Sequence, residues 1–131
     1  MSRITKPMMD RNGADGSNDL AYQYRRTIGF RVRDMRLQAE MTQRELGDKL
    51  GMGETAVSAL ELGRSSVSPE RYEQLAKLFN LDRTEWGQWL LRYTDPYLYA
   101  LIYGAEDKEL QNDLASLNAA SRVRRVRGPR H

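Results

Sequence analysis

Apolar residues recur at helical spacing along most of the chain. The first such stretch covers about residues 19–39, where one stripe holds Tyr24, Ile28, Val32 and Met35. Asp19 is suited to cap the start of this helix. Residues 1–18 contain Asn12-Gly13-Ala14-Asp15-Gly16-Ser17-Asn18 and almost no apolar periodicity. We therefore predict a disordered N-terminal arm followed by a long first helix.

Two short helices follow the first one. Thr42 and Glu45 have the spacing of a capping box and begin a helix that ends near Leu50. Gly51-Met52-Gly53 interrupts the pattern, and another short helix is predicted over about residues 54–62. Two short helices joined by a tight turn are typical of a helix-turn-helix.

The remaining pattern predicts further helices. Ser68-Pro69 and Asp82 with Glu85 begin the fourth and fifth helices. The apolar run 97–103 fits either a short helix or a strand, and the preceding Asp95-Pro96 favours a helix. A last helix over about 106–123 carries a leucine stripe. Without strand pairs joined by turn signals, the predicted class is all-α, a five-helix domain with a C-terminal helical extension.

The modest net charge of +3 conceals an uneven distribution of charge. Residues 21–40 carry a net charge of +3, residues 93–121 carry −4, and residues 122–131 hold five Arg and no acid. Of the 21 basic residues 17 are Arg, whose guanidinium suits phosphates and guanine edges. Two basic segments are therefore candidates for contact with phosphate, the alternative being a solvated helix face and a charged tail.

Composition excludes several kinds of chemistry. The chain has no Cys, and its one histidine is His131, so no disulfide framework, zinc finger or His-based metal site is expected. We predict no metal and no cofactor. An enzyme is the least supported class, because no nucleophile–base pair or phosphate loop is visible. No membrane span and no apolar signal core occur, which favours a cytoplasmic protein.

In a helix-turn-helix, the second helix lies in the DNA major groove, about 12 Å wide, with its N-terminal residues at the base edges. Here its polar face would be Glu54, Thr55 and Ser58, and its apolar face Val57 and Leu60. Met41-Thr42-Gln43-Arg44-Glu45-Leu46-Gly47 through Gly63-Arg64 resembles the lambda-repressor-like (XRE-type) helix-turn-helix family. The resemblance covers roughly residues 28–85.

The resemblance implies double-stranded DNA as partner. It matches Gln43 to a residue that binds phosphate and braces the recognition helix, and it matches Arg36 and Glu61 to a structural ion pair. It implies Gln at position 54, where this chain has Glu54, which can accept a hydrogen bond from cytosine but is repelled by phosphate. The candidate DNA-contacting residues are Gln43, Arg44, Glu54, Thr55, Ala56, Ser58, Arg64, Ser65 and Arg71.

We therefore predict a sequence-specific transcriptional regulator, a repressor that binds a pseudo-palindromic operator as a homodimer. An aromatic-rich surface is expected to form the dimer, the alternative being that these segments fold back onto the first and fourth helices. Its candidate residues are Trp86, Trp89, Leu90, Tyr93, Tyr97, Leu98, Leu101 and Ile102. The predicted organisation is an arm (1–18), a helix-turn-helix domain (19–94), a dimerising helical extension (95–121) and a basic tail (122–131).

Two other functions fit the same sequence. In an antitoxin of a toxin–antitoxin pair, residues 95–131 would bind a protein partner. In an interaction adaptor, the fold would remain after DNA binding was lost, and the net charge of −2 over residues 41–63 is compatible with that. The basic tail is either an arm that follows phosphates or a charged end without a role. The resemblance indicates a bacterial or phage-encoded protein, associated with the nucleoid when it is bound to DNA.

Overall fold

The computed structural model describes residues 19–126, with side chains as far as residue 119. The predicted arm over residues 1–18 lies outside the described residues, and so do the side chains of the predicted basic tail. The described residues form helices and no strand, which confirms the all-α class. The apolar run at 97–103, which fitted a helix or a strand, is helical.

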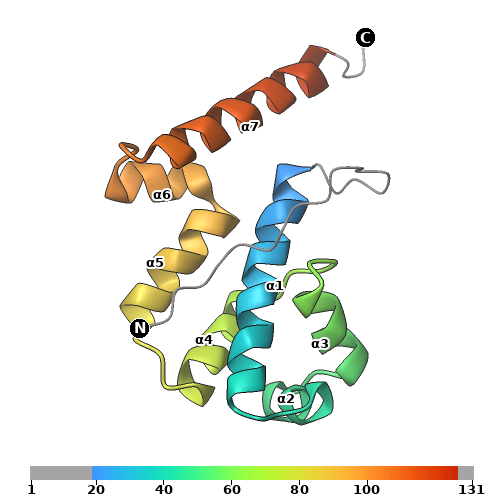
Figure 1. Cartoon of the computed structure of the whole chain (residues 1–131). Helices are drawn as coiled ribbons and strands as arrows, with labels where there is room; N and C mark the ends of the chain where they lie inside the picture. Colours follow the sequence, from blue (N-terminus) through green and yellow to red (C-terminus); the bar gives the residue numbers. More distant parts are fainter. Residues whose placement is uncertain (1–18, 127–131) are drawn as a thin grey trace. The chain divides into compact units, whose positions relative to one another are not determined.

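The chain divides into two compact units between Thr94 and Asp95. Unit 1 contains the first five helices and unit 2 the last two (Figure 1). Their bounds are α1 Leu20–Gln38, α2 Gln43–Leu50, α3 Glu54–Glu61, α4 Pro69–Leu78, α5 Arg83–Thr94, α6 Pro96–Tyr103 and α7 Lys108–Val126.

Side chains that cap backbone N–H groups determine where several helices begin. Asp19 accepts a hydrogen bond from the backbone of Ala21 at 3.1 Å. Thr42 and Glu45 form the predicted capping box, in which each side chain accepts from the other residue's backbone N–H, at 3.0 and 2.8 Å. Asp95 accepts from the backbone of Leu98 at the start of α6. These bonds satisfy donors that have no partner inside the helix.

The core of unit 1 lies among all five of its helices. Helix α3 packs against α1 and α2, while α5 packs against α1 and α4. The buried apolar residues are Ile28, Val32, Leu46, Leu50, Val57, Leu60, Leu75, Ala76, Trp86 and Leu90. Gly29 permits the close approach of α1 to α3, because a Cβ there would lie 2.3 Å from the Leu60 carbonyl oxygen.

Helix α5 contributes its aromatic residues to this core. Trp86 is 4% exposed and Leu90 is 6% exposed, and the Trp86 indole donates to the Tyr72 carbonyl at 2.9 Å. The Arg31 guanidinium lies 4.5 Å from the ring centre of Trp89, and burial lowers the pKa of Arg31. Trp86 and Leu90 thus pack inside unit 1, and their predicted place in a dimer interface stays a prediction.

Unit 2 consists of α6 and α7, which pack against each other. The Tyr97 hydroxyl and the Asn118 side-chain oxygen are 2.8 Å apart, and Leu110 is fully buried. Helix α6 leaves most of its large apolar side chains exposed, with Leu101 at 82%. No described helix is long and apolar enough to cross a membrane.

Candidate nucleic-acid interface

A tight turn sets the angle between α2 and α3. Gly51 ends α2 in the left-handed region with φ of 70°, a conformation that glycine adopts without steric cost. The backbone N–H of Met52 then donates to the Gly47 carbonyl at 2.8 Å. Helix α3 begins directly afterwards, with Gly53 as its N-cap. The turn therefore holds the start of α3 at the end of α2.

Helix α3 has a buried face and an exposed face. Val57 and Leu60 are buried against α1 and α2. Glu54, Thr55 and Ala56 are exposed, and Ser58 is half-buried. Among the described residues, the Glu54 carboxylate has no hydrogen-bond or ion-pair partner. Eight residues make a helix about 12 Å long, so this short polar surface has the dimensions of a major groove.

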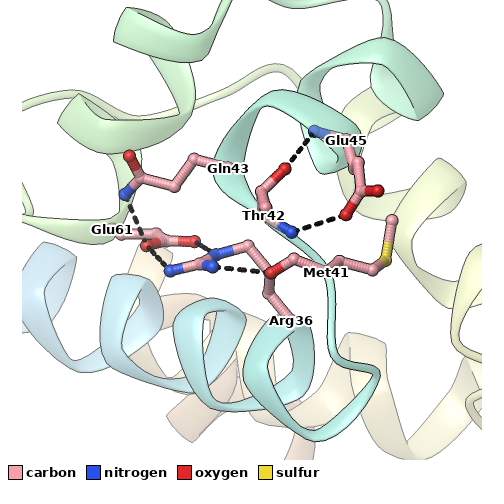
Figure 2. Close-up of polar contacts among 6 residues, drawn as sticks. All are labelled: Arg36, Met41, Thr42, Gln43, Glu45 and Glu61. Atoms are coloured by element: carbon pink, nitrogen blue, oxygen red, sulfur yellow. Dashed lines mark hydrogen bonds and ion pairs between the residues drawn. The ribbon is translucent and has the colours of Figure 1, made fainter.

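A buried polar network joins α3 to the first two helices (Figure 2). Arg36 on α1 donates to both carboxylate oxygens of Glu61, at 2.7 and 3.1 Å, and to the Met41 carbonyl at 2.8 Å. The Gln43 side-chain amide donates to Glu61 at 3.0 Å. The last residue of α3 is thus bound to α1 and to the first residue of α2, and this restrains the orientation of α3.

The side chain of Arg71 bonds to the end of α2. Its guanidinium donates to the carbonyls of Leu50 and Gly51 and lies 3.3 Å from the Gln74 side-chain oxygen. A cation at a helix C-terminus satisfies free carbonyls and interacts favourably with the helix dipole. The sequence carried no signal for this role, because the carbonyls lie about twenty residues before Arg71.

The other candidate contact residues lie at the surface. Arg44 and Arg64 are exposed, and neither forms a salt bridge with a described acidic residue. Ser65 is half-buried in the loop after α3. Gln43 is also half-buried, and its amide nitrogen donates a hydrogen bond to the Glu61 carboxylate. The structure thus places Gln43, Arg44 and the N-terminal residues of α3 on the two helices joined by the turn.

Nothing in the described part of the chain suggests a bound ion. No group of three or more metal-binding side chains occurs among the described residues. Residues 41–63 carry two basic and four acidic residues, and one of the acidic residues, Glu61, is buried against Arg36.

Comparison with known proteins identifies the region that holds these helices. Residues 32–86 match a family model described as helix-turn-helix. The matched region includes the turn, the Arg36–Glu61 pair and the start of α5. No curated protein and no solved structure matches the chain.

Proposed function

We propose that the chain is a DNA-binding regulator, a repressor that recognises a specific operator, because residues 32–86 match a helix-turn-helix family model. Binding at a promoter would exclude the transcription machinery. The observation that carries this proposal is the two-faced α3, whose apolar face is anchored in the core while Glu54, Thr55 and Ala56 project outward.

In this proposal the residues divide by role. Thr55, Ala56 and Ser58 contact base edges, and Glu54 accepts a hydrogen bond from a cytosine amino group in the major groove. Gln43, Arg44, Arg64 and Ser65 contact backbone phosphates and set the register. Arg71 supports this surface indirectly, because its bonds to Leu50 and Gly51 hold the turn in place before α3.

We propose that the active form is a homodimer. One eight-residue recognition helix reads only a few base pairs, so two copies are needed for a selective site. The exposed apolar residues of α6 provide a surface for the partner copy, namely Tyr97, Leu98, Leu101 and Ile102. Trp89 and Tyr93 are half-buried and pack against the core of unit 1, so they contribute less exposed area to the proposed dimer interface.

A binding selection from a random duplex library tests the proposed function. We expect a single motif with two inverted half-sites whose centres are about one helical turn apart. Replacing Thr55 and Ser58 with Ala should remove about 1–3 kcal/mol of specific binding per lost base contact. A library that shows no enrichment, with a folded protein, would contradict sequence-specific recognition.

A further inference from the structure

Three arginines from two segments lie next to Gly63, in the loop that follows α3. The Arg25 Nε on α1 donates to the Gly63 carbonyl at 2.9 Å. The backbone and Cγ of Arg26 approach Gly63 so closely that a Cβ on this glycine would lie 2.6 Å from Arg26 Cγ. Arg64 is the next residue and is exposed. Contacts at Gly63 thus bring the first part of α1 beside the loop that follows the recognition helix.

One aromatic ring accompanies two of these guanidinium groups. The ring centre of Tyr22 lies 5.8 Å from the Arg25 guanidinium carbon and 5.9 Å from that of Arg26. Contact with a ring face limits the freedom of an arginine side chain. The Nε of Arg25 is hydrogen-bonded, whereas its two terminal nitrogens form no hydrogen bond with a described residue.

The rest of the candidate interface has no net positive charge. Residues 41–63 carry a net charge of −2, which includes Glu45, Asp48 and Glu54 on α2 and α3. Phosphate neutralisation supplies most of the non-specific affinity of a DNA-binding protein. Arg44 and Lys49 on α2 are outnumbered by acidic residues over positions 41–63, so a net attraction for phosphate has to come from neighbouring segments.

We propose that Arg25, Arg26 and Arg64 form a phosphate-binding cluster that holds the DNA backbone beside the recognition helix. This inference rests on the proposed function. The far end of an eight-residue helix lies about 12 Å from its start, so it reaches the wall of the groove when the start faces the bases. Each guanidinium then donates to phosphate oxygens in the bidentate geometry that arginine favours.

The test measures binding of the full chain to a short mixed-sequence DNA duplex, by fluorescence anisotropy over a series of salt concentrations. The variants are Arg64→Gln and the double variant Arg26→Gln/Arg64→Gln. The matched control is Arg83→Gln, which removes the same charge from the start of α5, where Arg83 forms an exposed pair with Glu73. The Arg64 side chain forms no hydrogen bond or ion pair among the described residues, so Arg64→Gln tests the cluster without removing a side-chain interaction.

We expect the slope of log K against log salt to become shallower by about 0.9 for each phosphate contact removed. Replacing the same residues with Lys should restore most of the slope, because Lys also neutralises phosphate. Equal slopes for the cluster variants and the Arg83→Gln control would overturn the cluster while leaving the proposed function intact. A wild-type chain that binds no duplex DNA would overturn both.

Discussion

At the scale of single residues, the proposed function assigns to Glu54 the choice of the base that α3 reads. Its carboxylate is exposed at the first position of α3 and has no partner among the described residues. An ionised carboxylate only accepts hydrogen bonds, whereas the amide of glutamine both donates and accepts. Cytosine offers a donor in the major groove, while adenine offers a donor and an acceptor.

Glu54→Gln should therefore change the selected base at one position of each half-site from cytosine to adenine. Binding selections with the wild-type chain and the variant measure this change directly. Glu40→Gln is the control, since it removes an exposed carboxylate from the loop before α2. The control should alter affinity without altering the base. An unchanged motif for Glu54→Gln would show that this side chain reads no base.

The buried pair formed by Arg36 and Glu61 gives a second prediction at this scale. Their side chains are 9% and 2% exposed. Arg36→Met should lower the free energy of unfolding by about 3–5 kcal/mol, because it leaves the Glu61 carboxylate buried without its cation. Urea denaturation measures the loss. The double variant Arg36→Met/Glu61→Met should recover much of it, and a double variant no more stable than Arg36→Met would contradict this explanation.

At the scale of elements, two glycines in helices have opposite structural roles. A Cβ at Gly29 would lie 2.3 Å from a backbone carbonyl oxygen of α3, whereas a Cβ at Gly87 would meet nothing within 4 Å. Backbone cannot rotate away as the end of a flexible side chain can. The absence of a side chain at residue 29 thus allows α1 and α3 to pack this closely.

Gly29→Ala should accordingly reduce the free energy of unfolding by about 1–3 kcal/mol, because α1 and α3 must move apart. Gly87→Ala is the matched variant in α5. It should raise the free energy of unfolding by about 0.5–1 kcal/mol, since alanine favours the helix and finds open space. Thermal unfolding followed by circular dichroism compares the two. Destabilisation of similar size in both variants would refute the close-approach argument.

At the scale of the whole molecule, the proposed dimer depends on α6. Its eight residues Pro96–Tyr103 contain no charged side chain, so two copies can meet there without bringing like charges together. Leu101 is its most exposed large apolar side chain. Burying this surface between two chains would remove apolar area from water, which favours association.

Leu101→Gln in the full chain should therefore shift the protein from dimer to monomer and weaken operator binding. Light scattering at micromolar concentration measures the mass. Leu37→Gln provides the control, because Leu37 is an exposed leucine on α1, at 46% exposure. It should leave the mass unchanged. A monomeric wild-type chain would refute the dimer, and a dimeric Leu101→Gln variant would place the interface elsewhere.

The sequence by itself determined the local features of this protein. Helix starts at Asp19, Thr42 and Asp95 were predictable, because a cap and its backbone partner lie within three residues of each other. The all-α class followed from periodicity, and the described residues are indeed helical without strands. The helix-turn-helix resemblance was carried by residues at short spacing, and residues 32–86 match a helix-turn-helix family model. These features depend on neighbours along the chain, which sequence patterns display.

Only the tertiary structure decided the features that join distant segments. Aromatic residues occur both in cores and in interfaces, so their presence in the sequence does not distinguish the two. In the folded chain, Trp86 and Leu90 lie inside unit 1. The bonds from Arg71 to the end of α2 and from Arg25 to Gly63 span 20 to 38 residues. Such contacts form when helices pack, because packing brings together side chains that are far apart in the sequence. Their separation along the chain has no regular spacing that a sequence pattern could display.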